Sequence, residues 1–189
     1  LTFVMLYFII YYMHDATQPV IDSILQWMEK FVEVPHPSFG NMPPCPYARQ
    51  YRVQDKIKIV QAPLDAKGNP PDIWETAEQV FDTWNNDFEA IIVAREHVAR
   101  RYNSAEAVSA QIKELNDKYK SKDLVALEDH PMDPEEIDGV RMNHGGLILV
   151  VIQRLSKINK HSEMLKGGEY YDKWSQENLD DVVNWRFKK

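Results

Sequence analysis

The chain has 189 residues, with 29 acidic and 22 basic side chains, a formal net charge of -7 and a single cysteine. This length predicts one domain with room for a hydrophobic core. One cysteine excludes an internal disulfide framework and an all-cysteine zinc site. The acidic balance argues against a general nucleic-acid-binding protein, because affinity for phosphate comes mainly from clustered Lys and Arg. We therefore expect a soluble, cytoplasmic α/β protein that binds no nucleic acid.

The first 13 residues, LTFVMLYFIIYYM, form an uncharged apolar run. The run is much shorter than the ~20 residues that a helix needs to cross a bilayer, and it lacks the basic region and cleavage site of a secretory signal. Its composition favours a packed strand or helix; the alternatives are a translated extension, an interface with another chain and a membrane contact. We expect residues 1–13 to be an apolar N-terminal segment, residues 14–189 to form a single domain, and no segment to span a membrane.

Strand and helix patterns alternate after this segment. Apolar residues at helical spacing predict a helix from Pro19 to Pro35, and the proline-rich stretch that follows, to Arg49, must be a loop, ordered or disordered. Strands are expected at 56–61, 88–94 and 123–128, with helices that begin at Asp72 and Ser104 between them. This order predicts a small parallel or mixed sheet of three or four strands flanked by helices.

The apolar run LILVVI at 147–152 fits a strand or a buried helix. We expect a helix, because the apolar stripe continues past ordinary strand length. The stripe consists of Ile148, Val151, Ile152, Leu155 and Ile158.

A last helix is expected within 169–187.

The one cysteine, Cys45, lies in the sequence Pro-Pro-Cys-Pro-Tyr-Ala-Arg. A Cys-Pro-aromatic motif also occurs in thioredoxin-like enzymes, where the thiol lies at a helix N-terminus directly after a core strand. Here Cys45 follows Asn-Met-Pro-Pro and has no second cysteine beside it, so that context is missing. Two further hypotheses stay open for this thiol. In the first, Cys45 is functional in another way, as a nucleophile, redox thiol or metal ligand. In the second, it is an inert buried cysteine.

A second group of polar residues follows the third expected strand, at 128–144. Ligands of α/β sheets usually bind beyond the carboxyl ends of strands, which places Asp129 and His130 where a site is expected. These side chains point to a general base or to divalent-metal chemistry, but no helical His-x-x-x-His spacing is present, so we assign no metal ligands. The alternative is a solvated acidic loop that caps the next helix.

The residues just before the LILVVI run suggest an anion site. The amides of Gly145 and Gly146 would open the expected helix and hold a carboxylate or phosphate, with Arg141 as the charged partner and Asn143 and His144 beside it. The lysine and the glycine spacing of a P-loop are absent.

Several motifs follow one another along the chain: Trp27-x-Glu29 in an opening helix; Cys-Pro-aromatic-Ala at 45–48; apolar strands at 57–60 and 90–93; His130-Pro131 followed by Asp-Pro-x-x-Ile at 133–137; and a turn with Asn143 that leads into an apolar helix ending in Arg at 147–154. Together they resemble an uncharacterised family of small bacterial proteins with a Cys-Pro-Phe-Ala motif, a domain of unknown function. That family usually has Asn-Arg-Ser-Pro where this chain has Met-Asn-His-Gly at 142–145, so a role for His144 is specific to this chain. The resemblance implies a fold and a site region in which Cys45, His130 and Asn143 converge, but no reaction.

We expect a small-molecule-binding protein or enzyme whose site joins the Cys45 loop to the segment 129–144; the sequence indicates no cofactor. The alternative is a non-catalytic interaction or assembly protein, in which the apolar N-terminal segment packs on another copy to form a homo-oligomer and the proline-rich loop is a contact surface. The candidate catalytic residues are Cys45, Asp129 and His130, and the candidate ligand-binding residues are Arg141, Asn143, His144 and Gly145.

Overall fold

The computed structural model describes residues 15–62, 73–96 and 104–188. The elements in chain order are α1 (Gln18–Trp27) with a π-helical extension (Met28–Val32), a 3-10 turn (Pro37–Phe39), α2 (Ala48–Val53), β1 (Ile57–Gln61), α3 (Ile73–Asp82), β2 (Ala90–Glu96), α4 (Ala105–Tyr119) with a 3-10 turn (Lys120–Lys122), β3 (Leu124–Asp129), β4 (Glu136–Ile137), β5 (Val140–Arg141), β6 (Leu147–Arg154), α5 (Leu155–Leu165), α6 (Gln176–Val182) and a 3-10 turn (Asn184–Phe187).

Four strands form the central sheet, in the order β1-β2-β6-β3. β1 and β2 are parallel, and β6 lies antiparallel between β2 and β3. β4 and β5 form a separate two-stranded hairpin. The expected class, a single α/β domain with a small mixed sheet flanked by helices, is therefore confirmed.

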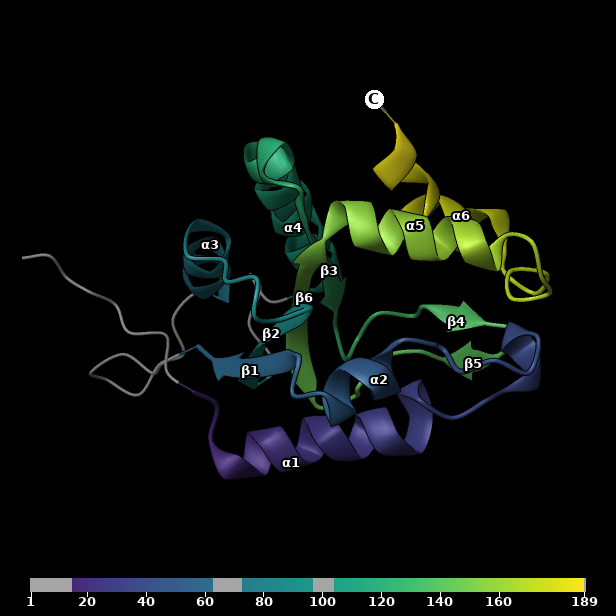
Figure 1. Ribbon diagram of the computed structural model, residues 1–189, viewed down its shortest axis with the longest axis horizontal. Coiled ribbons are helices and arrows are strands. Elements are labelled where there is room, and N and C mark those ends of the chain that lie inside the picture. Colours follow the sequence, from purple (N-terminus) through teal and green to yellow (C-terminus); the bar gives the residue numbers. More distant parts are fainter. Residues whose placement is uncertain (1–14, 63–72, 97–103, 189) are drawn as a thin grey trace, which may run out of the picture.

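Helices cover both faces of this sheet (Figure 1). Successive side chains of a strand point to opposite faces, so Ile91 and Val93 of β2 pack with α3 and α4, whereas Ile92 and Ala94 pack with α1. In Figure 1, α3 and α4 lie above the sheet, α1 lies below it, and α5 and α6 lie to the upper right. The second face is therefore shared between α1 and the segments that surround the site described below.

The prediction of a helix at 147–152 is wrong, because this run is β6, in the middle of the sheet, and the helix begins only at Leu155. Both faces of β6 are covered: Ile148 packs on the α3 side and Leu149 on the α1 side. A strand buried on both faces shows no polar alternation. The stripe continued past strand length because α5 follows β6 without a loop.

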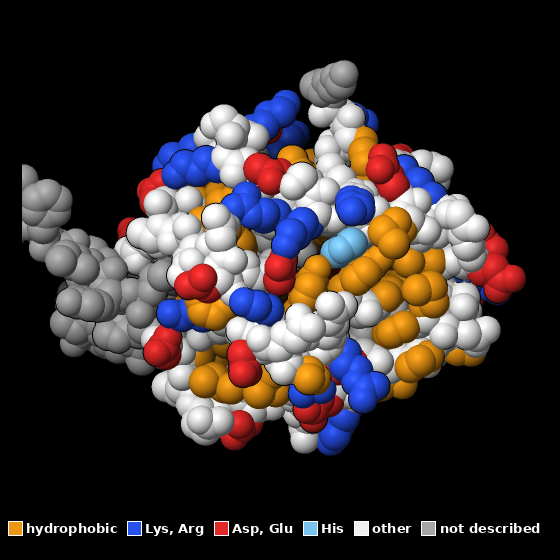
Figure 2. Space-filling view, viewed as in Figure 1, with side chains coloured by type: hydrophobic (Ala, Val, Ile, Leu, Met, Phe, Trp, Pro, Cys, Tyr) orange, Lys and Arg blue, Asp and Glu red, His pale blue; other side chains and the backbone are white. Residues whose placement is uncertain are grey.

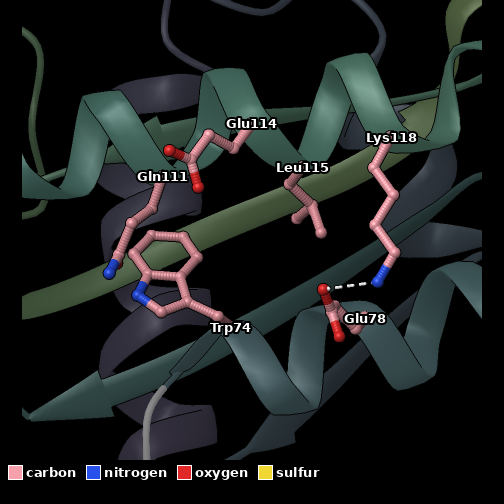
Figure 3. A pocket seen from close by; sticks show the side chains of 6 residues that line it. All are labelled: Trp74, Glu78, Gln111, Glu114, Leu115 and Lys118. Carbon is pink, nitrogen blue, oxygen red and sulfur yellow. Dashed lines mark hydrogen bonds and ion pairs between the residues drawn. The ribbon is translucent and has the colours of Figure 1, made fainter.

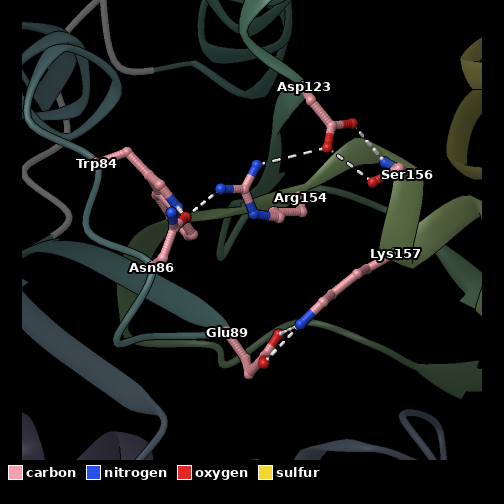
Figure 4. A network of polar contacts seen from close by, with 7 residues as sticks. All are labelled: Trp84, Asn86, Glu89, Asp123, Arg154, Ser156 and Lys157. Atoms are coloured by element: carbon pink, nitrogen blue, oxygen red, sulfur yellow. Dashed lines mark hydrogen bonds and ion pairs between the residues drawn. The ribbon is translucent and has the colours of Figure 1, made fainter.

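A polar network fixes this strand-to-helix junction (Figure 4). Asp123 accepts hydrogen bonds from the backbone N–H of Ser156 (2.8 Å) and from its hydroxyl (2.7 Å). Arg154 bonds to Asn86 and pairs with Asp123 at 3.5 Å, while Lys157 pairs with Glu89 at 2.5 Å. The start of α5 is thus held to the segments that precede β3 and β2, which sets the direction in which α5 leaves the sheet.

The structure confirms the helix from Pro19 and the three strands. It also confirms the Ser104 cap, since the Ser104 hydroxyl accepts the Ala107 N–H at 3.2 Å. The helix expected within 169–187 is shorter: 169–173 form turns, and Ser175 caps α6 by accepting the Asn178 N–H at 3.0 Å. Asp72 and residues 1–13 lie outside the described residues. Across 15–62, 73–96 and 104–188, no helix is long and apolar enough to cross a bilayer.

The proline-rich stretch is an ordered loop. Phe39 within it is fully buried and packs with Ile137 and Tyr170 in a small apolar cluster of its own. His36 opens the 3-10 turn, its Nδ1 accepting the Ser38 N–H at 3.2 Å. This cluster, which we call the Phe39 cluster, joins the loop to the β4–β5 hairpin and to the segment before α6.

Candidate functional site

A cavity of about 560 Å³ lies on the second face of the sheet. We call it the sheet pocket. In the space-filling view, apolar side chains gather between α2 and α5, next to a histidine (Figure 2). The lining includes a sheet floor (Ile57, Ala90, Ile92, Leu127, Val151), one wall from α1, the proline-rich loop and α2 (Trp27, Met28, Pro44, Cys45, Tyr47, Tyr51), and another from α5 to the C-terminal turn (Ile158, His161, Ser162, Tyr171, Trp174, Arg186).

Two contacts join these walls. The His161 ring of α5 stacks on the Tyr47 ring, with the centroids 3.6 Å apart, and the Tyr170 hydroxyl donates a hydrogen bond to the Pro44 carbonyl. Because one contact is made by each end of the short Pro44–Tyr47 segment, the loop that carries Cys45 is held against the rim of the pocket.

Cys45 occupies this rim. Its N–H donates to the Val32 carbonyl at 3.0 Å, and its side chain is exposed to solvent through the pocket. The surrounding walls nevertheless displace much of the water around the sulfur, and this desolvation raises the pKa of the thiol. The N–H groups of Tyr47 and Ala48 lower the pKa, but by less. The thiol is therefore accessible but protonated at neutral pH.

At neutral pH we expect iodoacetamide to alkylate Cys45 more slowly than free glutathione, because the thiolate is the reacting form and the raised pKa lowers its fraction. The rate should keep rising at pH values where the glutathione rate has levelled off. Intact-protein mass spectrometry measures the rate, and every adduct is assigned because the chain has one cysteine. A faster reaction than that of glutathione would contradict the raised pKa.

The end of β3 brings carboxylates to the pocket. Asp129 accepts the backbone N–H of His144 at 3.0 Å, and burial raises its pKa to about 7, with Glu135 and Asp133 adding repulsion. Burial likewise raises the pKa of Glu135 to about 7 and raises that of Glu128. Buried carboxyls of this kind exchange protons near neutral pH, which suits general acid–base work.

His130 is 1% exposed and also lines the pocket. Its Nδ1 accepts the Met132 N–H at 3.0 Å, so this nitrogen is already engaged by the backbone. This arrangement favours Asp129 over His130 as the base of the site.

The four candidate ligand-binding residues separate in the structure. Asn143 lines the sheet pocket; its Nδ2 donates to the Asp133 carbonyl at 2.9 Å, and its Oδ1 is buried with no hydrogen-bond partner among the described residues. Arg141 is turned away and donates to the Pro131 carbonyl at 2.7 Å. Of the seven candidates, the cavity lining thus brings together Cys45, Asp129, His130 and Asn143.

His144 and Gly145 lie outside the lining. The His144 Nε2 is 3.1 Å from the Ser23 hydroxyl, and its ring lies edge-on to Trp27 with centroids 5.6 Å apart. Gly145 has φ +85° in the turn before β6. Because the glycines open a strand rather than a helix, the helix-based reason for an anion site there is lost.

Arg186 also lines the pocket, and sequence analysis missed it. It is 7% exposed, and its Nη2 donates to the Ser162 hydroxyl at 3.0 Å. Nothing in the surrounding Asn-Trp-Arg-Phe distinguishes this side chain from a surface arginine. Glu128 and Glu135 were also missed as site residues, although both flank the strand end where a site was expected.

A second, smaller hollow of about 220 Å³ lies between α3 and α4 (Figure 3). The charged groups at one end of it are already paired, since Lys118 contacts Glu78 at 2.9 Å. The sheet pocket is larger and brings together four of the candidate residues, so it is the better candidate site.

Within the described parts of the chain, no group of three or more His, Cys, Asp or Glu side chains is arranged to hold a metal ion. Comparison with models of known protein families, with curated protein sequences and with solved structures gives no match. The resemblance to the Cys-Pro-Phe-Ala family therefore stays a prediction. Fold and site together define an α/β domain with a large, partly polar pocket on its sheet.

Proposed function

We propose that this protein binds a small molecule in the sheet pocket. The observation that carries the proposal is that the Cys45 loop and the end of β3, far apart in sequence, line one cavity of about 560 Å³ above an apolar sheet floor. Ligand sites are typically cavities of roughly 300–1,000 Å³, mostly apolar with a few convergent polar groups. Asp129, His130 and Asn143 supply such groups here.

A catalytic version of this proposal gives these residues separate roles. Cys45 is the nucleophile or redox thiol, and because its pKa is raised it needs a base to accept its proton. The base we assign is Asp129, which lines the same cavity and, with a pKa of about 7, is partly ionised at neutral pH. Asn143 holds a carbonyl or anionic group of the ligand.

The alternative, an assembly protein, depends on residues 1–13, which lie outside the described residues. Its second element, the proline-rich loop, contributes Pro44, Cys45 and Tyr47 to the sheet pocket, which supports a role in ligand binding. We also propose a cytoplasmic location, because a single unpaired cysteine suits a reducing compartment.

Replacing Val151 by Trp should weaken binding of Nile red, a neutral fluorescent dye, to the sheet pocket. Val151 lies on β6 in the pocket floor and is only partly buried, so a larger side chain there projects into the cavity. Fluorescence titration measures the loss, expected to be on the order of tenfold or more in affinity. Val53→Trp is the matched control, since Val53 is 68% exposed and outside the lining.

The proposal fails if Nile red does not bind the wild-type protein, or if Val53→Trp weakens binding as much as Val151→Trp. A second readout covers the case in which Val151→Trp does not fold. Bound dye should slow the alkylation of Cys45 in the wild type, because the thiol lies on the rim of the same cavity.

A further inference from the structure

Arg186 is a buried cation of the sheet pocket. The residue is 7% exposed, and its Nη2 makes one hydrogen bond, to the Ser162 hydroxyl. Nε and Nη1 are buried and have no hydrogen-bond partner within the described chain. The N–H groups on these two nitrogens are therefore available to an acceptor on a ligand.

No carboxylate among the described residues lies within ion-pair distance of Arg186. Arg52 is a useful contrast, because Glu29 and Glu33 both hold it at 2.7 Å and raise its pKa. Burial instead lowers the pKa of Arg186 to about 10, which still leaves it protonated at neutral pH. A buried charge without a counter-charge is costly, and a ligand anion would offset this cost.

We propose that Arg186 binds the carboxylate of a ligand whose apolar body lies on the sheet floor. This inference rests on the proposed function, since it needs a ligand in the sheet pocket. Each edge of the guanidinium that carries one of the unpaired nitrogens also carries an N–H of Nη2, and such an edge matches the two oxygens of a carboxylate. Arg186 is one of the residues that line the cavity.

The charges around Arg186 favour a monoanion over a dianion such as a phosphate ester. His161 also lines the pocket, and burial lowers its pKa, so the ring is neutral at pH 7. Glu128, Asp129, Asp133, Glu135 and Asp181 also line the pocket, and those of their carboxyls that are ionised repel a second negative charge on a ligand. One guanidinium in a lining that is otherwise acidic suits a single carboxylate.

Much of the remaining lining is apolar and aromatic. Ile92, Leu127 and Val151 form the floor, and Tyr171 and Trp174 contribute aromatic rings. The Tyr171 hydroxyl is near enough to Arg186 for the guanidinium charge to lower its pKa, against the larger effect of burial. The ligand class is therefore a monocarboxylic acid with an aliphatic or aromatic body.

The experiment compares octanoate with octanamide, which have the same chain but different head groups, as competitors of Nile red. Octanoate should displace the dye from the wild type at a concentration on the order of tenfold lower than octanamide, because hydrogen bonds to charged groups are the stronger ones. Arg186→Met should remove this preference, which is the ratio of the two competitors measured in the same variant and so does not depend on how the substitution changes the affinity for Nile red. Arg186→Lys should retain part of the preference, since it keeps the charge without the planar donors.

Arg49→Met is the matched control, because Arg49 is exposed and outside the lining; it should keep the octanoate preference. Equal displacement by octanoate and octanamide in the wild type overturns the inference, as does a preference that survives in folded Arg186→Met. If Arg186→Met does not fold, the inference is decided by the octanoate preference of the wild type and by its expected partial loss in Arg186→Lys. Failure of Nile red to bind at all counts against the proposed function instead, so the two failures are distinguishable.

Discussion

Replacing Phe39 by Ala is expected to lower the free energy of unfolding by about 3–5 kcal/mol and to abolish binding of Nile red to the sheet pocket. Phe39 is fully buried. Its ring lies 5.7 Å from that of Tyr170 and 6.3 Å from that of Trp174, both of which line the pocket. Removing the ring leaves a void beneath this wall, and side chains packed against a void shift into it.

The matched control is Phe81→Ala, on the opposite side of the sheet. Phe81 is 1% exposed, stacks on Tyr119 with the centroids 4.7 Å apart, and belongs to the cluster under α3 and α4. Its truncation should cost a similar free energy of unfolding, again about 3–5 kcal/mol, but leave the dye affinity of the folded protein within about twofold, because it does not line the pocket.

Urea unfolding followed by tryptophan fluorescence gives the stability of both variants, and dye titration at a temperature where each is folded gives the affinity. Phe39→Leu, which removes less volume, replaces Phe39→Ala if the latter does not fold. Equal losses of dye affinity in the Phe39 and Phe81 variants would mean that the Phe39 cluster does not shape the pocket.

Local signals in the sequence were enough to locate most elements of the fold. The Ser104 cap and the alternating run at 56–61 are properties of a few neighbouring residues, and both predicted the element that forms. The run at 147–152 was assigned wrongly because its partners, β2 and β3, determine its conformation. Tertiary context therefore overrode a pattern that fits two structures equally.

The candidate site divides in the same way. Asp129 and His130 follow directly at the end of an expected strand, a position that can be inferred from the chain order, and both line the pocket. Arg186 acquires its role only because the C-terminal turn packs against α5, where Ser162 accepts its hydrogen bond. Burial and the distance to a counter-charge are properties of the packed chain, so no sequence motif marks this arginine.

Stability should fall as the pH rises from about 5.5 to about 8, and Asp129 should account for up to about 2 kcal/mol of that fall. Burial raises the pKa of Asp129 from 3.8 to about 7. Between these values the folded state binds the proton more tightly than the unfolded state. The stabilisation is therefore fully present below about pH 4 and is lost as the pH rises through about 7.

Asp129→Asn tests this dependence, because the amide keeps the shape and an acceptor for the His144 N–H but carries no charge at any pH. The loss of stability between about pH 5.5 and about pH 8 should shrink by up to about 2 kcal/mol in this variant, measured by urea unfolding at each pH. Asp172→Asn, at an exposed position outside the lining, should leave the wild-type slope unchanged. If stability depends on pH in Asp129→Asn as it does in the wild type, the pKa of Asp129 is not raised in the folded protein. The reason for choosing Asp129 as the base of the site is then lost.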